Sequence, residues 1–151
     1  MSYFFDSSAL VKRYHPEPGS AWMWAVCRSP ARIALYVSAV AEVEVVVALH
    51  RTARLEGKHP AWAAAQANSF LRHLAREYRS VAIDAHTVRL ARTLATVHAT
   101  SPTLRSMDAI QIAGALLAHL LDPDVVFVTA DVRQATVAQR EALLVVDPTY
   151  P

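Results

Sequence analysis

The feature that most constrains this fold is an alternation along the chain between short apolar runs, typical of strands, and longer stretches typical of helices. The strand-like runs lie at residues 3–5, 33–37, 81–83, 125–128 and 143–146. Strands separated by helices form βαβ units, whose right-handed crossovers place helices on both faces of a parallel sheet. The sequence therefore predicts an α/β fold, a three-layer α/β/α sandwich with a short, mainly parallel central sheet.

Helical patterns fill the intervals between these runs. They cover residues 7–14, 20–28, 38–56, 61–78, 85–98, 106–121 and 132–141. Gly57 is suited to end the third helix and Asp84 to cap the fifth. A Thr-Ser-Pro-Thr loop at residues 100–103 leads into the sixth. The run at 125–128 is apolar throughout, which is typical of a strand buried on both faces.

Length and composition limit the class of protein. The chain has 151 residues, 54% of them hydrophobic, which is enough to form the core of one domain. The single cysteine, Cys27, excludes a disulfide framework and a multi-cysteine zinc site. The sequence lacks a signal-peptide pattern and an uncharged run of membrane-spanning length. With only three glycines, clustered phosphate-binding loops are excluded as well. We expect one domain, residues 1–151, in the cytoplasm.

Two carboxylates follow predicted strands. Asp6 comes directly after the first strand, and Asp131 follows the run at 125–128 after two intervening residues. Ligands of parallel sheets bind beyond the carboxyl ends of the strands, so both side chains are expected at that edge. Each aspartate also precedes a predicted helix, where a carboxylate commonly serves as an N-cap. Either one alone therefore has a structural explanation.

Two further carboxylates, Glu44 and Asp108, lie inside predicted helices among apolar neighbours. The residues three and four positions from Glu44 are all apolar, and Asp108 shares a helix face with Ile112 and Ala115. A charged group on a core-facing stripe is costly unless it is paired or binds a metal. If all four carboxylates converge, their repulsion requires a cation, and an all-oxygen ligand set selects Mg²⁺ or Mn²⁺.

Other catalytic arrangements are poorly supported. The seven histidines lack the HExxH spacing of zinc hydrolases, and no GxSxG elbow presents a nucleophilic serine. A receiver-like signalling domain needs a lysine after a late strand, but the lysines here are Lys12 and Lys58. A phosphatase with a DxDx(T/V) loop needs a second aspartate where this chain has Ser8. Cys27 is interpreted as a small packing residue.

Charge and aromatic residues leave two interpretations open. Residues 50–106 contain nine arginines and lysines and three acids, whereas the two ends carry more acids than bases. This pattern suits a protein that attracts a polyanion and holds a cation, and it equally suits solvated arginines on alanine-rich helices. Four aromatic residues are candidates either for base stacking or, as is more common at helical spacing, for the core: Trp22, Trp24, Trp62 and Phe70.

Five motifs occur in order over nearly the whole chain. They are Asp6-Ser-Ser-Ala-Leu-Val-Lys-Arg-Tyr with the following Pro16-Glu-Pro-Gly-Ser; Ser38 six residues before Glu44; Arg105-Ser-Met-Asp108-Ala-Ile-Gln-Ile-Ala; Phe127-Val-Thr-Ala-Asp131; and Leu144-Val-Val-Asp-Pro148. Together they resemble the motifs of PIN-domain ribonucleases of the VapC toxin type. The resemblance implies a PIN-like fold and a Mg²⁺- or Mn²⁺-dependent endoribonuclease. It also implies a homodimer and a cognate VapB-type antitoxin that holds the toxin inactive.

The resemblance assigns roles to particular residues. The acidic site of that family maps onto Asp6, Glu44, Asp108 and Asp131, the same carboxylates that the burial argument selects. We expect Asp6 and Asp108 to ligate the principal ion and Asp131 to share it. Glu44 is expected to position or deprotonate the attacking water. Two hydroxyl positions that support the site, and three arginines that are candidates for RNA phosphate contacts, complete the set: Ser8, Thr129, Arg51, Arg54 and Arg105.

The chain departs from the family pattern in two places. Many relatives carry a further acid or asparagine shortly after the fourth carboxylate, where this chain has Val132, Arg133 and Gln134. This difference argues against a second metal ion in the free protein. Ala142 stands where a glycine commonly precedes the last strand, and we expect it to lengthen the final helix slightly. The alternative function is a catalytically silent PIN-like scaffold for RNA binding or assembly, which the intact set of carboxylates disfavours.

Overall fold

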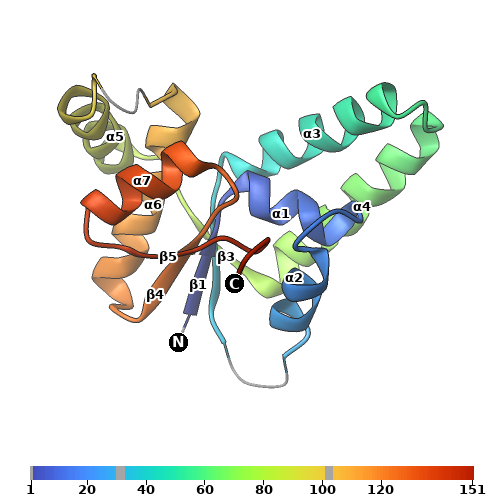
Figure 1. The fold of residues 1–151 in the computed structure, drawn as a ribbon, viewed down its shortest axis with the longest axis horizontal. Coiled ribbons are helices and arrows are strands. Elements are labelled where there is room, and N and C mark those ends of the chain that lie inside the picture. The colour runs from blue at the N-terminus through green and yellow to red at the C-terminus, as the bar shows by residue number, and fades with distance from the viewer. Residues whose placement is uncertain (1, 30–32, 101–103) are drawn as a thin grey trace.

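The computed structural model describes residues 2–29, 33–100 and 104–151. The elements in chain order are β1 (Ser2–Phe5), α1 (Ser7–Tyr14), α2 (Ser20–Cys27), β2 (Leu35–Ser38), α3 (Ala41–Leu55), α4 (Pro60–Glu77), β3 (Tyr78–Val81), α5 (Ala85–Val97), α6 (Ser106–Leu121), β4 (Val125–Val128), α7 (Val132–Arg140) and β5 (Leu144–Val146). Within the described residues, the strands form one parallel sheet in the order β3-β2-β1-β4-β5, with helices on both faces (Figure 1). The predicted α/β/α sandwich is confirmed. Residues 101–103 of the predicted loop lie outside the described ranges, in which no helix is long and apolar enough to cross a membrane.

The two faces of the sheet bury separate hydrophobic cores because successive strand residues point to opposite faces. On β1, Phe4 packs with Phe127 and Ile112 on the face that α5, α6 and α7 cover. Phe5 packs with Phe70 on the opposite face, which α1 to α4 cover. All residues of β4 are buried, which confirms the prediction of a strand enclosed on both sides.

Helix α6 lies close to the sheet because Gly114 has no side chain. A Cβ atom at this position would lie 3.0 Å from the Cζ atom of Phe4 and 3.6 Å from the Cβ atom of Ser38. The first distance is shorter than ordinary carbon contacts, so a larger residue would push α6 outward. The close packing holds the middle of α6, two turns after Asp108, against Phe4 of β1 and Ser38 of β2.

The strand order creates a topological switch point between β1 and β4. From β1 the chain adds β2 and β3 on one side, then returns through α5 and α6 to add β4 on the other side of β1. Connections that leave in opposite directions open a crevice for ligands beyond the carboxyl ends of such strands. Phe5 of β1 is paired with Val128 of β4. The residues that follow them, Asp6 and Thr129, therefore meet at this edge, where their side chains are hydrogen-bonded.

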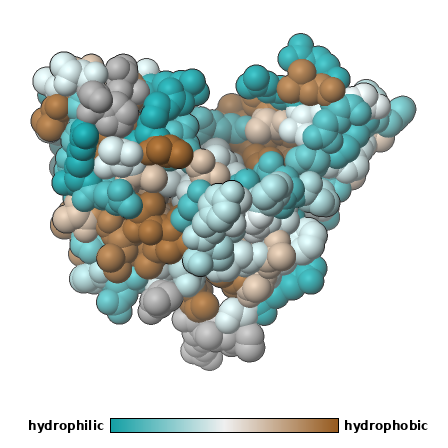
Figure 2. Space-filling view, in the orientation of Figure 1, coloured by the Kyte–Doolittle hydropathy of each residue, from teal (hydrophilic) through white to brown (hydrophobic). Residues whose placement is uncertain are grey.

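Helices α3 and α4 form a hairpin that extends past the sheet like an arm, opposite the lobe formed by α5, α6 and α7 (Figure 1). The turn of the hairpin is fixed near the end of α1, because Nζ of Lys58 lies 3.1 Å from Nδ1 of His15 and 2.9 Å from Oε2 of Glu56. Figure 2 shows the surface hollowed between the arm and the lobe. The starts of α1, α3 and α7 lie at the base of this hollow (Figure 1).

Two predicted boundaries in the first half of the chain are wrong. Strand β3 begins at Tyr78 rather than at residue 81, because the Tyr78 side chain is buried against Phe5 with the ring centroids 6.3 Å apart. Strand β2 extends to Ser38, which is paired with β3, so α3 starts at Ala41. In both places a residue with helical periodicity in the sequence is taken into the sheet by tertiary packing.

The prediction that Ala142 lengthens the last helix is also wrong. Helix α7 ends at Arg140, and Ala142 has a positive φ of 61°. The backbone N–H of Ala142 donates to the carbonyl of Gln139, and that of Leu143 donates to the carbonyl of Ala138, each at 3.0 Å. This pair of bonds is a Schellman motif, which normally places glycine in the left-handed position. The motif therefore ends the helix even though the residue there is alanine.

Candidate functional site

Asp6 directly follows β1 and is fully buried. It is the N-cap of α1, and its Oδ1 accepts hydrogen bonds from the backbone N–H of Ala9 and from Oγ of Ser8, both at 2.8 Å. Its Oδ2 accepts from Oγ1 of Thr129 at 2.8 Å. Burial raises the pKa of Asp6 to about 6, although the hydrogen bonds it accepts act to lower it. Every donor in this set is neutral, so the set leaves the negative charge of the carboxylate unbalanced.

Asp131 occupies the equivalent position after β4, as the N-cap of α7. Its Oδ1 accepts from the backbone N–H groups of Arg133 at 2.8 Å and Gln134 at 3.3 Å. Its Oδ2 accepts from the Arg133 guanidinium at 3.2 Å. Burial alone would raise the pKa of Asp131, but the hydrogen bonds and positive charge of Arg133 hold it below its usual value. Both aspartates therefore have the N-cap role that their sequence positions suggested.

Asp108 lies in the first turn of α6, where 8% of the residue is exposed. Its Oδ2 accepts from the backbone N–H of Arg105 at 3.2 Å, and its Oδ1 accepts from Nε2 of Gln134 at 3.2 Å. Burial raises the pKa of Asp108, the Arg105 bond opposes the rise, and the negative charge of Asp131 adds to it. The sequence-based expectation that Asp108 faces the protein interior agrees with this burial.

Glu44 is half-buried rather than buried, which corrects the expectation drawn from its apolar neighbours. Only one stripe of α3 packs against the protein because the helix extends past the sheet, and Val47 is 59% exposed. Oε2 of Glu44 accepts from Oγ of Ser7 and from Nε2 of Gln111, both at 2.7 Å. Nε2 of Gln111 also donates to Oγ of Ser7 at 2.8 Å. Glu44 is thus tied to the start of α1 and to α6.

The four carboxylates are connected through these neighbours at one edge of the sheet. In addition to burial, the negative charge of Asp131 raises the pKa of both Asp6 and Asp108. Asp131 therefore lies close enough to each of the other two aspartates to interact with it electrostatically. Glu44 is joined to the residue after Asp6 through the Ser7 hydroxyl. Across residues 2–29, 33–100 and 104–151, however, no three acid, histidine or cysteine side chains are arranged to hold a metal ion without side-chain movement.

The chemistry of the donor set fits a hard divalent cation. The carboxylate oxygens of Asp6, Asp108 and Asp131 are the ligand type that Mg²⁺ and Mn²⁺ prefer. Next to them, the side-chain oxygens of Gln111 and Gln134 are buried and have no hydrogen-bond partner among the described residues. Buried polar atoms of this kind are uncommon in folded proteins and favour a missing ion or water. A cation at this edge would balance the buried charge of Asp6.

Sequence reasoning found the acids but not the side chains that hold them. Ser8 and Thr129 contact Asp6 as expected, and Ser8 also accepts from the backbone N–H of Ala130 at 3.0 Å. Gln111 was not singled out, although it is 1% exposed. The signal was present in the sequence, because Gln111 is a polar residue between isoleucines, one turn after Asp108. The same burial argument that selected Asp108 applies to it.

The expected nucleic-acid contacts divide into exposed and buried residues. Arg51 and Arg54 are exposed on α3, and Arg105 is exposed at the start of α6. Phe70 is fully buried, and Trp22 and Trp62 pack against the core beneath α1 to α4, which favours the core interpretation for all three. Trp24 is 37% exposed, and its Nε1 donates to the carbonyl of Arg13. Cys27 packs beside the same core, as predicted.

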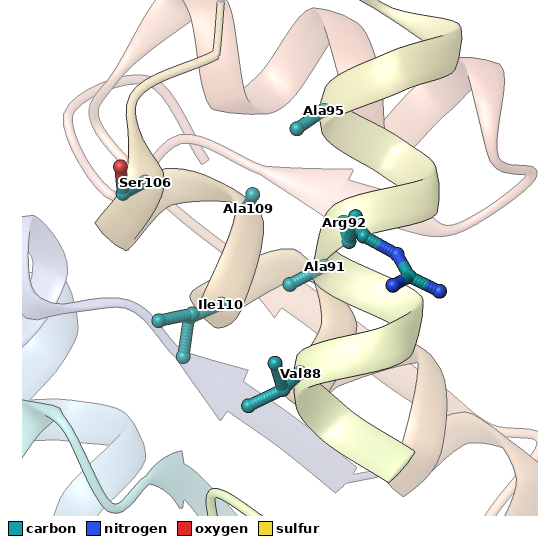
Figure 3. A pocket seen from close by; sticks show the side chains of 7 residues that line it. All are labelled: Val88, Ala91, Arg92, Ala95, Ser106, Ala109 and Ile110. Carbon is teal, nitrogen blue, oxygen red and sulfur yellow. The ribbon is translucent and has the colours of Figure 1, made fainter. Parts of the chain in front are cut away.

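A second hollow lies between α5 and α6 and differs in chemistry. Figure 3 shows Val88, Ala109 and Ile110 lining it, with Arg92 extending from α5 at its edge. No carboxylate or histidine is among its lining residues. This groove therefore has none of the groups that the candidate site uses.

Three comparisons relate the chain to known proteins. A model of the PIN domain family matches residues 3–140. A search of curated proteins finds no match. A chain of VapBC-1 from nontypeable Haemophilus influenzae aligns with a TM-score of 0.67 at 13% identity, over 99% of both chains. A chain of VapBC2 from Rickettsia felis, bound to a DNA fragment from their promoter, aligns with a TM-score of 0.64 at 13% identity, over 97% of this chain and 98% of that one. A chain of FitAcB from Neisseria gonorrhoeae aligns with a TM-score of 0.61 at 17% identity, over 97% of both chains. At these identities the structural likeness shows a shared fold.

Proposed function

The chain belongs to the PIN domain family, and from this membership we propose that it is a metal-dependent endoribonuclease that hydrolyses RNA phosphodiester bonds with an activated water molecule. The observation that carries the proposal is the connection of Asp6, Glu44, Asp108 and Asp131 at the switch point between β1 and β4. Acids this costly to bury are explained by a cation that binds there. A polyanionic substrate needs the same cation, because carboxylates alone would repel its phosphates.

The aspartates are assigned to metal binding. Asp6 and Asp108 would hold Mg²⁺ or Mn²⁺, with Asp131 as a further ligand. When bound, such an ion polarises a phosphoryl oxygen, lowers the pKa of a water molecule and stabilises the departing 3′-oxyanion. Ser8 and Thr129 orient the Asp6 carboxylate through their hydroxyl groups, and the full burial of Asp6 excludes bulk water from that ligand.

Glu44 is assigned to the attacking water. Both of its hydrogen bonds from the described residues are accepted by Oε2, which leaves Oε1 to accept a proton from water. Ser7 and Gln111 fix the carboxylate between α1 and α6, and the half-buried position leaves part of Glu44 accessible to solvent. Attack by water leaves a 5′-phosphate and requires no 2′-hydroxyl nucleophile.

Substrate and partner follow from the surroundings of the site. Arg51 and Arg54 are exposed on α3, and Arg105 is exposed at the start of α6. These arginines would contact RNA phosphates without reading the bases. The solved structures that this chain resembles are VapBC and FitAB complexes. On that basis we propose that the chain is a VapC-type toxin inhibited by a VapB-type antitoxin. Its sequence resemblance to that family favours a homodimer.

A second candidate function is a catalytically silent RNA-binding or assembly scaffold. It is favoured by one observation, namely that no three ligating side chains in the described ranges are already gathered for a metal. Binding of RNA without cleavage would distinguish this candidate from the nuclease.

Cleavage of a labelled single-stranded RNA by the purified chain tests the proposal. We expect cleavage with Mg²⁺ or Mn²⁺, none with chelator, and products that carry 5′-phosphates. Asp108→Asn is expected to abolish it, while Asp122→Asn, which changes a turn before β4, serves as the matched control. Cleavage that persists in chelator, or products with cyclic phosphates, would contradict the metal-activated mechanism.

Brief expression of the chain in cells tests the biological assignment. Growth arrest that the Asp108→Asn variant does not cause, together with new RNA 5′ ends, would support a toxin and identify its RNA. Copurification of a small protein encoded next to it would identify the antitoxin. Growth unaffected by a chain that cleaves RNA in vitro would contradict the toxin role.

A further inference from the structure

Arg133 lies where a metal ion would approach Asp131. Its guanidinium is 3.2 Å from Oδ2 of Asp131, and its positive charge also acts on Asp108. The other Asp131 oxygen is occupied by the backbone N–H groups at the start of α7. A metal ion would therefore have to bind Asp131 through Oδ2. The Arg133 guanidinium already contacts this oxygen.

Gln134 has the matching position at Asp108. Its Nε2 donates to Oδ1 of Asp108 at 3.2 Å, while Oδ2 accepts from the backbone of Arg105. Both oxygens of Asp108 are thus satisfied by donors from the chain. In contrast, the donors to Asp6 are neutral hydroxyl and backbone groups, and no cationic side chain of residues 2–29, 33–100 or 104–151 donates to it.

The described residues include three neighbouring aspartates, yet their side chains are not arranged to bind a metal ion. The contacts of Arg133 and Gln134 explain this, because they occupy the oxygens of Asp131 and Asp108. We propose that Arg133 is a built-in counter-ion that competes with a divalent cation for Asp131, so that the cation binds only by displacing the guanidinium from Oδ2. This inference rests on the proposed function and adds the residue that sets metal affinity. Arg133 acts on the cation through Asp131 and is therefore a positioning residue.

The geometry allows the displacement. The Arg133 side chain is 38% exposed, so its guanidinium can move into solvent without opening a cavity. Asp131 keeps its two backbone hydrogen bonds through Oδ1 when the guanidinium leaves, so the cap of α7 is preserved. A partly exposed ion pair such as this one is weakened by solvent, whereas a divalent ion gains more from the same oxygen.

Titration calorimetry with Mn²⁺ tests the proposal without relying on activity. Arg133→Met should bind Mn²⁺ about tenfold more tightly than the unmodified chain, as expected when one positive charge is removed a few ångströms from a divalent ion. Arg133→Lys keeps the charge and should stay within about threefold of the unmodified chain. Arg72→Met, an exposed arginine on α4, is the matched control and should leave the affinity unchanged.

The outcomes separate this inference from the proposed function. Equal or weaker Mn²⁺ binding by Arg133→Met, in protein whose thermal unfolding shows it to be folded, overturns the role of Arg133 and leaves the metal site intact. Tighter binding by Arg133→Lys as well would also overturn it, because the charge is retained. If neither the unmodified chain nor any variant binds Mn²⁺, the proposed metal-dependent function fails together with the inference.

Discussion

The turn from β1 into α1 and the turn from β4 into α7 have the same construction. Each follows one of two paired parallel strands, and each ends with an aspartate that caps the next helix. The residue two positions after the aspartate is Ser8 in the first turn and Arg133 in the second. Ser8 donates a hydroxyl to Asp6, whereas Arg133 donates a guanidinium to Asp131.

This single difference, together with burial, gives the two carboxylates opposite properties. Asp6 is fully buried among neutral donors, and its pKa is raised to about 6. Burial acts to raise the pKa of Asp131, but the hydrogen bonds from Arg133 and Gln134 and the charge of Arg133 together lower it. At Asp131 a metal ion must therefore displace a side-chain cation before it binds. At Asp6 the carboxylate contacts only neutral donors.

The largest expected effect is on RNA cleavage. Asp6→Asn should lower the cleavage rate with Mg²⁺ roughly 1,000-fold or more, because it removes a fully buried charge that accepts hydrogen bonds from neutral donors only. Asp131→Asn should lower it roughly 10- to 100-fold, since Arg133 already balances that charge. Single-turnover rates for both variants measure the difference. Equal losses, or a larger loss for Asp131→Asn, would show that the two turns do not differ in function.

The same pair of substitutions should change stability in opposite directions in the presence of chelator at pH 7.5. Folding raises the pKa of Asp6 from 3.8 to about 6, so the ionised carboxylate destabilises the folded protein by roughly 3 kcal/mol at this pH. Asp6→Asn removes most of this cost and should raise the free energy of unfolding by about 2 kcal/mol. Asp131→Asn should lower it by about 0.5–1 kcal/mol through loss of charge at the start of α7. Urea unfolding measures both, and a stabilised Asp131→Asn variant would contradict the comparison.

The stability that Asp6 contributes should depend on pH in a defined window. Folding favours the protonated form of Asp6, so this contribution is fully present below pH 3.8 and is lost as the pH rises through about 6. The stability gain of Asp6→Asn in chelator should therefore grow between about pH 4 and 7 and then level off. The effect of Asp131→Asn should stay constant over that range, because the pKa of Asp131 is lowered. A flat profile for Asp6→Asn would contradict the raised pKa.

The sequence could predict the elements of this comparison because they depend on local pattern. The alternation of strands and helices, and the position of Asp6 and Asp131 after two strands, are sufficient to place both at one edge of a parallel sheet. The pattern could not predict the start of β3 at Tyr78, because that residue continues the helical periodicity and only its packing against Phe5 draws it into the sheet. The partial exposure of Glu44 could not be predicted for a similar reason, since it depends on how far α3 extends past the sheet.

Substitution of the residue directly after each aspartate should have a smaller effect on RNA cleavage than substitution of the aspartates. Ser7 donates to Glu44, whereas the corresponding residue after Asp131 is Val132, which is 76% exposed. Ser7→Val should lower kcat about tenfold with little change in KM, because Glu44 keeps only its Gln111 bond. Val132→Ser is the matched control, and a similar loss of kcat in that variant would contradict the assignment.

The smallest expected effect concerns how the two helices end. Helix α1 is followed by its C-cap His15 in an extended conformation before Pro16, whereas α7 is followed by Ala142 at a φ of 61°. A non-glycine residue in this conformation costs about 1 kcal/mol, so Ala142→Gly should raise the free energy of unfolding by about 0.5–1 kcal/mol. Ala135→Gly, inside the same helix, should lower it by a similar amount because glycine is a poor helix former. If the Schellman motif ends α7, chemical unfolding should show changes of opposite sign in the free energy of unfolding of the two variants. A loss of stability in Ala142→Gly equal to that in Ala135→Gly would instead mean that the helix continues through residue 142, as the sequence alone suggests.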